Sequence, residues 1–271
     1  MIYLVTSNQL LFESPVYKVI SVEESLAIMK DWKMIQFDTE TYGKDPHVGK
    51  LLLAQFGNID KTVQIEVDCT TINISLYKEL LESTFIIGQN LKFDLQWLYN
   101  YSIIPLKVYD TMIVEQLLYL GYPPEYKDPI NGISYSLQSI ADRRLHIYLN
   151  KTVRGEIQWR GIDNDVVKYA ANDVLHLYDI MVQQVAECRK KNCIIGAKLE
   201  CDFVPVIAYM EWCGIHLDEQ KWKHKMIIDR QHLEEAINDL NQYVISNPNL
   251  SEFTSIDRQG DLFSGFNLTP K

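Results

Sequence analysis

The sequence predicts an α/β fold in which helices cover a central sheet and a helical extension follows. Over the first 130 residues, short apolar runs alternate with segments of helical periodicity, which is the pattern of a sheet flanked by helices. Beyond residue 133 only helical patterns recur. At 271 residues the chain is long enough for one large domain and an appendage.

Four apolar, β-rich runs are predicted to be strands: residues 34–38, 51–56, 62–67 and 85–88. Three segments carry apolar residues at i, i+3 and i+4 and are predicted to be helices: residues 72–82, 91–101 and 111–120. Residues 121–133 are rich in Pro and Gly, which indicates a loop.

The second half of the chain is predicted to be helical over residues 136–145, about 163–190, 199–212 and 218–245. Gly214 is expected to end the third of these helices as its C-cap. Residues 247–271 are polar and show no periodicity. We expect a first domain over residues 1–195 and a helical extension over residues 196–271.

Composition is that of a soluble globular protein, with 47% hydrophobic and 23% charged residues. No apolar run approaches the roughly 20 residues of a membrane span, and the N-terminal residues lack the basic and apolar regions of a secretory signal. Five cysteines without a C-x-x-C pair favour a reducing compartment. We therefore expect a cytoplasmic protein, or one in the host cytoplasm if it is phage-encoded.

The net charge of −10 argues against nucleic-acid binding, because phosphates are normally bound by a basic surface. The argument weakens where clustered carboxylates hold divalent cations, since the cations offset the negative charge. Charge alone does not decide whether the chain binds nucleic acid.

Five residues are candidates for a site. Asp38 and Glu40 end an apolar run, and residues i and i+2 of a strand share a face. Asp94 lies near the start of a predicted helix, and Tyr169 and Asp173 are one helical turn apart. Taken singly, each has an ordinary structural explanation, such as a solvated strand end or an acid in the first turn of a helix.

Together the four carboxylates offer hard oxygen ligands of the kind that Mg²⁺ and Mn²⁺ prefer. Two such ions about 4 Å apart clamp a phosphodiester for in-line attack. The combination therefore predicts phosphate chemistry.

Three motifs in the same order resemble those of the DEDD exonuclease superfamily: FDTET at 37–41, GQNLKFD at 88–94 and YAANDV at 169–174. They are most similar to the proofreading domain of family A, DNA polymerase I-like, polymerases. The superfamily's histidine subclass has a His five residues before the last Asp, where this chain has Lys168, so the tyrosine subclass fits. The resemblance, over about residues 30–185, implies a ribonuclease H-like exonuclease fold with a mixed sheet flanked by helices.

The similarity extends beyond the nuclease motifs. Residues 200–218 resemble the segment that leads from the exonuclease into the polymerase thumb, and GFNLTPK at 265–271 resembles the family's F-N-x-x-S-P-K signature. The palm and fingers that carry nucleotide transfer are absent. An excised fragment and a polymerase split between chains both remain open.

The resemblance implies two divalent cations, Mg²⁺ or Mn²⁺, held by Asp38, Glu40, Asp94 and Asp173. In that scheme Asp38 bridges both ions, Glu40 and Asp173 complete the site of the ion that activates water, and Asp94 holds the second ion through water. A phenol with a pKa of about 10 is a poor base at neutral pH, so Tyr169 is expected to orient the nucleophile.

The resemblance also implies that Thr39, Gln89, Asn90 and Lys92 bind the terminal nucleotides. For Asn90 the alternative is that it caps the following helix. Lys44 stands where many family members have a leucine wedge, and it is suited to contact phosphate instead. Phe93 and Trp159 are suited either to stack on bases or to pack in the core. A basic region is expected either to follow the DNA backbone or to form a solvated face: Arg143, Arg144, Lys151, Arg154 and Arg160.

We therefore predict a two-metal-ion 3′→5′ exonuclease that degrades DNA, preferably at single-stranded 3′ ends, to nucleoside monophosphates. It is expected to be the proofreading part of a DNA polymerase, partnered by a polymerase domain or subunit, with no polymerase activity of its own and no membrane contact. One alternative is an exoribonuclease of the ribonuclease D type, which residues 149–159 resemble. The other is a non-catalytic DNA-binding module.

Overall fold

A computed structural model describes residues 1–9, 13–123, 125, 127–128, 132–149 and 157–247. The chain divides into two compact units, Met1–Gly214 and Ile215–Lys271. The first unit contains the sheet and all the candidate site residues, and the second contains one long helix.

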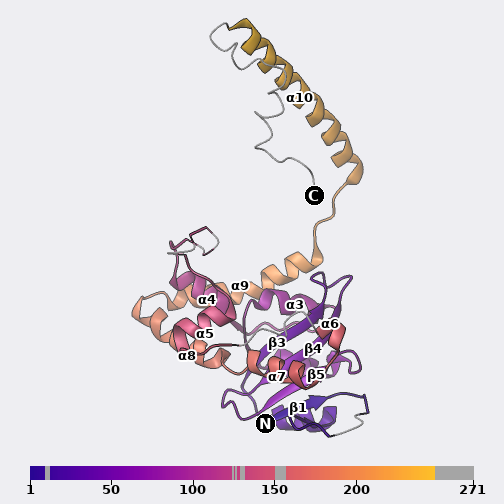
Figure 1. The fold of residues 1–271 in the computed structure, drawn as a ribbon, viewed down its shortest axis with the longest axis vertical. Coiled ribbons are helices and arrows are strands. Elements are labelled where there is room, and N and C mark those ends of the chain that lie inside the picture. The colour runs from indigo at the N-terminus through magenta and orange to yellow at the C-terminus, as the bar shows by residue number, and fades with distance from the viewer. Residues whose placement is uncertain (10–12, 124, 126, 129–131, 150–156, 248–271) are drawn as a thin grey trace. The chain divides into compact units, whose positions relative to one another are not determined.

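The first unit is built on a seven-stranded mixed sheet in the order β2-β1-β5-β4-β3-β6-β7 (Figure 1). Strand β3 pairs antiparallel with β4, and β4 antiparallel with β5, whereas the other neighbours are parallel. The strands are β1 (Ile2–Val5), β2 (Lys18–Val19), β3 (Met34–Tyr42), β4 (Lys50–Gly57), β5 (Gln64–Asp68), β6 (Phe85–Gly88) and β7 (Val108–Asp110). The mixed sheet that the resemblance implied is confirmed.

All four predicted strands are present, as β3 to β6, and β3 continues four residues beyond its predicted end. Three strands that we did not predict, β1, β2 and β7, extend the two edges of the sheet. They are four, two and three residues long, too short to show the alternation by which a strand is detected.

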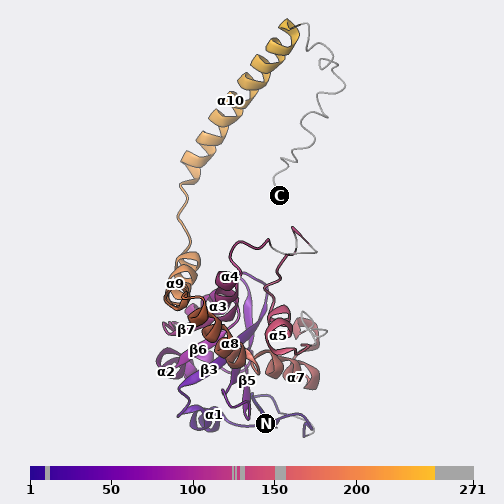
Figure 2. The same ribbon diagram turned by 90° about the vertical axis from the view of Figure 1, so that its left-hand side faces the viewer.

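Helices surround the sheet on both faces (Figure 2). They are α1 (Val22–Met29), the 3₁₀ turn η1 (Ile74–Tyr77), α2 (Lys78–Ser83), α3 (Leu91–Tyr99), α4 (Thr111–Leu118), α5 (Leu137–Leu145), α6 (Ile157–Arg160), α7 (Asn164–Asp173), α8 (Leu177–Lys190) and α9 (Ile194–Cys213). The stretch predicted over 163–190 is divided into α7 and α8. Gly214 is the C-cap of α9 with φ 67°, as predicted.

Helix α1 was missed, although its sequence carries a capping box. Ser21 accepts from the Glu24 backbone N–H, and the Glu24 carboxylate accepts from the Ser21 N–H. That signal was sufficient to predict where the helix begins.

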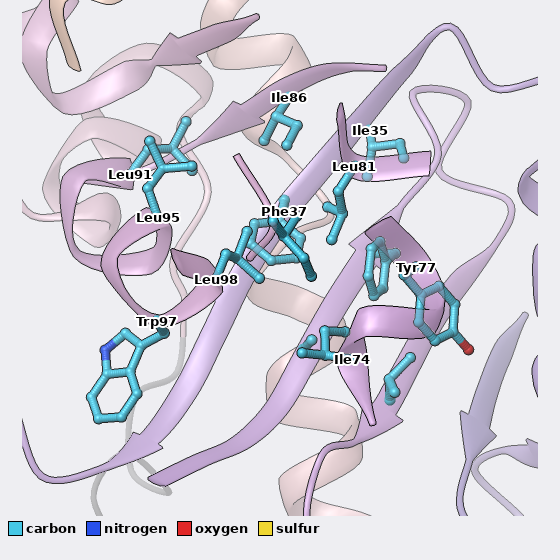
Figure 3. Packing of buried hydrophobic residues seen from close by; sticks show 14 of the residues in the cluster. Ile35, Phe37, Ile74, Tyr77, Leu81, Ile86, Leu91, Leu95, Trp97 and Leu98 are labelled. Carbon is cyan, nitrogen blue, oxygen red and sulfur yellow. The ribbon is translucent and has the colours of Figure 1, made fainter. Parts of the chain in front are cut away.

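The larger of two main hydrophobic cores lies between the sheet and helices that include α2 and α3 (Figure 3). Ile35 and Phe37 of β3 point into it and are fully buried, as are Tyr77 and Trp97. Because side chains alternate along a strand, Gln36, Asp38 and Glu40 point to the opposite face. The packing of alternate residues in this core therefore fixes the direction of both carboxylates.

The second unit contains α10 (Glu219–Ser246). Its N-cap residue is Asp218, whose side chain accepts from the Lys221 N–H. No residue of α10 is buried. The polar segment and the GFNLTPK signature lie outside the described residues, apart from Asn247. The domain boundary that we predicted after residue 195 falls at the second residue of α9, and both it and the resemblance to a thumb remain predictions. No described helix is long and apolar enough to cross a membrane.

Candidate functional site

Strand β3 supplies the first two acidic groups. Asp38 lies opposite Gln55 of β4, and Glu40 lies opposite Leu53. A β-bulge follows directly, because the register shifts between Glu40 and Thr41. Bulges bend a strand and re-aim its end, and here the bend leads into the loop that carries Lys44.

Helix α7 brings the third acidic group to the sheet. Asp163 caps the helix by accepting from the N–H groups of Asp165 and Val166. At the other end, a Cβ on Gly57 would lie 2.8 Å from the backbone oxygen of Val174, so the absence of a side chain there permits the close approach. Asp173 is thereby held against the carboxylates of β3.

Asp38, Glu40 and Asp173 each offer a carboxylate oxygen within 4.8 Å of the others. Tyr169, one turn before Asp173, is buried and hydrogen-bonded to it. Asp38 and Glu40, on one face of β3, and Tyr169 and Asp173, on one face of α7, therefore lie together.

Asp94 approaches from α3 and is tied to the strand residue between the two acids. The Thr39 hydroxyl donates to Asp94 Oδ1 at 2.5 Å, and both residues are buried. Thr39 points to the face opposite Asp38 and Glu40, so Asp94 is connected to the site from the other side of the strand. This explains why Asp94 lies near the three-carboxylate group without being part of it.

Burial and the mutual repulsion of the acids determine the electrostatics of the site. Burial raises the pKa of Asp38 well above its ordinary value, and the neighbouring carboxylates of Asp94, Asp173 and Glu40 raise it further. Burial raises the pKa of Asp94 to about 8, against the opposing hydrogen bond from Thr39. The Tyr169 pKa is also raised, first by burial and then by Asp173, so this phenol stays protonated at neutral pH.

A cavity of about 730 Å³ opens over these groups. Its lining includes all five proposed catalytic residues and three of the four predicted substrate-binding residues: Asp38, Thr39, Glu40, Gln89, Asn90, Asp94, Tyr169 and Asp173. Lys44 and Phe93 also line it, as do Met112, Tyr135 and Ser136, which the sequence did not single out.

The fourth predicted substrate residue, Lys92, lies elsewhere on α3. Its Nζ pairs with Glu211 Oε1 of α9 at 2.8 Å, and Lys92 is not among the described residues that line the cavity. On a helix, consecutive residues are about 100° apart, so Lys92 points away from the face that Asn90, Phe93 and Asp94 present to the cavity. The structure therefore does not bring Lys92 to the site.

Gln89 and Asn90 line the cavity in different ways. The Gln89 amide donates to the Tyr135 carbonyl at 2.8 Å and accepts from the Thr111 hydroxyl, so it is engaged at both ends. Asn90 is the N-cap residue of α3 in a left-handed conformation, φ 59° and ψ 43°, but its side chain makes no capping hydrogen bond. The capping alternative for the Asn90 side chain is therefore wrong.

The predicted basic region is only partly as expected. Arg143 and Arg144 both bind the buried Glu115, at 2.9 and 2.5 Å, and the Arg144 side chain is 7% exposed. Arg144 is therefore part of a buried ion pair and belongs neither to a solvated face nor to a DNA track. Arg160 pairs with Asp163 and Asp165, and Trp159 is 80% exposed rather than packed in the core. Lys151 and Arg154 lie outside the described residues.

Two buried acids near the site were not anticipated. Asp110, at the end of β7, accepts four backbone hydrogen bonds. Its position just before a helical pattern was the available signal, because Asp is a preferred N-cap. Glu66 of β5 is fully buried, and neither of its carboxylate oxygens has a hydrogen-bond partner among the described residues. For Glu66, a single acid within a short apolar run, the sequence offers no comparable signal.

The donor set fits divalent cations with hard-ligand preferences. All its members are carboxylates, three converge, and mutual repulsion raises their affinity for any positive charge, proton or metal. A cation there would offset the cost of holding the acids together.

The family model of the 3′-5′ exonuclease domain of DNA polymerase A matches residues 15–186. Two curated relatives are DNA polymerases I. That of Aquifex aeolicus is 29% identical over 160 residues, or 59% of this chain, and that of Borreliella burgdorferi is 27% identical over 242 residues, or 82%. The aligned part is 25% of the length of each relative.

Solved structures with the same fold include Brucella melitensis NrnC, with a TM-score of 0.62 and 20% identity over 79% of this chain and 94% of NrnC. Escherichia coli RNase D, an exoribonuclease involved in structured RNA processing, gives a TM-score of 0.58 and 20% identity over 69% of this chain and 48% of RNase D.

Proposed function

Because this chain belongs to the 3′-5′ exonuclease family of DNA polymerase A, we propose that it degrades DNA from single-stranded 3′ ends, releasing nucleoside monophosphates, with two divalent cations. The observation that carries the proposal is the convergence of Asp38, Glu40 and Asp173 within 4.8 Å in a cavity that Tyr169 and Asp94 also line. Carboxylates gathered on the wall of an open cavity combine metal binding with access for a phosphodiester.

The roles follow from position. The Asp38 carboxylate interacts electrostatically with those of Asp94, Asp173 and Glu40, so it would hold cations together with these neighbours. Divalent cations bound there lower the pKa of the attacking water and stabilise charge on the leaving 3′-oxygen. Tyr169, held protonated beside Asp173, orients the attacking water through its hydroxyl. Thr39 holds Asp94 in place by its hydrogen bond rather than contacting the nucleotide itself.

Substrate recognition is assigned to the remaining cavity residues. The Asn90 carboxamide is available to a terminal nucleotide because it does not cap α3. Phe93 offers a ring for stacking, and exposed Lys44 is suited to a phosphate. We do not assign Lys92 a substrate contact, given its ion pair with Glu211.

We extend the proposal to proofreading in company with a polymerase domain or subunit. It is supported by the names of the two curated relatives and by the alignment of this chain with a quarter of each. The polymerase activity of those relatives is not proposed for this chain.

The test is digestion of single-stranded DNA labelled at the 3′ or the 5′ end, with Mg²⁺, Mn²⁺ or EDTA, beside RNA of matched sequence. We expect immediate release of the 3′ label as mononucleotide, progressive shortening of the 5′-labelled strand, and no reaction in EDTA. An Asp38→Ala variant is the control for contaminating nuclease. Faster degradation of RNA would favour the ribonuclease D type, and folded but inactive protein in Mn²⁺ would establish a non-catalytic module.

A further inference from the structure

Asp110 is a buried acid that joins the beginnings of two helices. It ends β7 and lies opposite Gly88 of β6 in the parallel pair, where β6 turns into α3. Its Oδ1 accepts from the Asn90 N–H at 3.0 Å and its Oδ2 from the Leu91 N–H at 2.8 Å. Oδ1 also accepts from the Met112 and Ile113 N–H groups at 2.9 and 3.3 Å, at the start of α4.

One carboxylate therefore satisfies the first free amides of both helices. Helix N-termini favour negative charge, because their unpaired N–H groups and the helix dipole both point at the anion. This accounts for a carboxylate with no exposed surface that takes part in no ion pair among the described residues. Four hydrogen bonds to one side chain make the relative position of α3 and α4 depend on it.

The consequence for the cavity lies in Asn90. A helix normally takes its N-cap hydrogen bond from the side chain at the Asn90 position. Here the Asn90 side chain makes no such bond, and Asp110 of the neighbouring strand accepts instead from the Asn90 and Leu91 N–H groups, just before that turn. The Asn90 backbone is held in the left-handed conformation, and its carboxamide takes no part in capping α3. Asp94 lies one turn further along the same helix, so the hydrogen bonds of Asp110 also set the start of the turn that carries it.

We propose that Asp110 is a positioning residue for the nuclease site: by capping α3 from β7, it directs Asn90 into the cavity and places Asp94 against Thr39. The inference rests on the proposed function for its kinetic consequences. Its structural part, the placement of Asp94, stands independently and is measurable by metal binding.

The main test variant is Asp110→Asn, which keeps the size of the side chain. It replaces one carboxylate oxygen with an NH₂ group, so at least one backbone N–H group loses its acceptor. The matched control is Ser21→Ala, which removes the cap of α1 at a helix whose residues do not line the cavity. Both variants lose helix-cap hydrogen bonds, so a general loss of stability affects both. Circular dichroism and thermal melting in EDTA establish that each is folded.

Two measurements follow. Calorimetric titration of metal-free protein with Mn²⁺ is expected to show weaker binding in Asp110→Asn than in wild type, and unchanged binding in Ser21→Ala. In the nuclease assay, kcat/KM of Asp110→Asn should fall by about 10–100-fold, the range found for residues that orient metal ligands. In the double variant Asp94→Ala with Asp110→Asn, the loss of kcat/KM should be smaller than the product of the two single losses, because Asp110 acts in part through Asp94.

Wild-type Mn²⁺ affinity in folded Asp110→Asn would overturn the proposal, as would independent, additive losses in the double variant. If Asp110→Asn does not fold, Asp110→Ser, which keeps an acceptor for the α4 amides, is subjected to the same titration and is expected to bind Mn²⁺ more weakly. If wild type binds Mn²⁺ but cleaves neither DNA nor RNA, the proposed function fails while the titration still decides the role of Asp110.

Discussion

Tyr169 shows how its surroundings limit what one side chain can do. A buried phenol beside carboxylates loses its proton with difficulty, because the phenolate would be poorly solvated and repelled by Asp173. The ordinary phenol pKa already favoured an orienting rather than a basic role, and burial raises the pKa of Tyr169 further. Tyr169 is therefore expected to matter less than the acids around it.

Substitution tests this difference directly. Tyr169→Phe should slow hydrolysis by about 10-fold, the worth of one hydrogen bond, because the ring and its packing remain. Asp38→Ala and Asp173→Ala should lower kcat by on the order of 10³-fold or more, since they remove charge that acts on the transition state. Single-turnover rates at saturating Mn²⁺ measure these changes. Equal losses in all three variants would contradict the division of roles.

The acids themselves predict how stability changes with pH. Asp38, Asp94 and Glu66 all have pKa values raised by burial first. An acid with a higher pKa in the folded than in the unfolded protein contributes stability that is complete below the unfolded pKa and is lost as pH rises through the folded pKa. For Asp94 this window runs from 3.8 to about 8.

We therefore expect the melting temperature of the metal-free protein to fall between pH 5 and pH 8, and Mg²⁺ or Mn²⁺ to reverse most of the fall at pH 8. Glu66→Gln, which imitates the neutral acid, should make the decline shallower, whereas the same change at exposed Glu79 should not. Thermal melts in EDTA between pH 5 and pH 8 measure the melting temperatures of the wild type and both variants. A melting temperature that rises with pH would show that these carboxylates are ionised and stabilised in the folded protein.

At the scale of elements, the site depends on how closely α7 approaches the sheet. Val166, Val167 and Ala170 of α7 are fully buried, and Gly57 leaves room for the backbone at the end of the helix. Any side chain at position 57 would push against Val174, the residue directly after Asp173. The geometry of the carboxylate group is thus linked to one glycine on β4.

Gly57→Ala should destabilise the protein by about 1–3 kcal/mol, as overpacking does, and should also lower kcat by moving Asp173. Gly196→Ala is the matched control, because that glycine lies in α9 and the nearest atom to an added Cβ is 3.7 Å away. There the substitution should stabilise the helix by up to about 1 kcal/mol and leave kcat unchanged. Chemical denaturation and steady-state kinetics measure both variants. Unchanged stability and kcat in Gly57→Ala would show that Val174 moves aside without cost.

At the scale of the whole molecule, every proposed catalytic residue lies in the first compact unit. That unit ends at Gly214 and includes α9, which packs on α3, α4 and β7. In the second unit, α10 contributes no buried residue. We therefore expect the first unit to fold without α10.

A protein ending at Gly214 should keep its nuclease activity on single-stranded DNA and its free energy of unfolding within about 0.5 kcal/mol of the full chain, as for changes outside packed regions. Ending the chain at residue 195, before nearly all of α9, should instead destabilise it, because the truncation removes Val204 and Ala208 from the main core and exposes the side chains that they cover. Urea titrations of the two truncated proteins and the full chain compare them. Equal stability of the two truncated proteins would contradict the role given to α9.

Sequence by itself determined the elements that carry the site and the residues gathered there. Strands β3 to β6 and helices α3, α4, α5 and α9 follow from local periodicity, which a long enough run of buried and exposed positions makes visible. The i, i+2 spacing of Asp38 and Glu40 and the i, i+4 spacing of Tyr169 and Asp173 fixed two pairs on common faces, because those periods are properties of the backbone.

Tertiary structure decided what depends on partners distant in the chain. The short strands β1, β2 and β7 form because neighbouring strands supply their hydrogen bonds, and the partner of Lys92, Glu211, comes from the distant helix α9. The start of α3 is held by Asp110, twenty residues later, whose carboxylate accepts from the Asn90 and Leu91 N–H groups. Local sequence patterns do not reveal these interactions, because each one requires a partner that only the folded chain brings into contact.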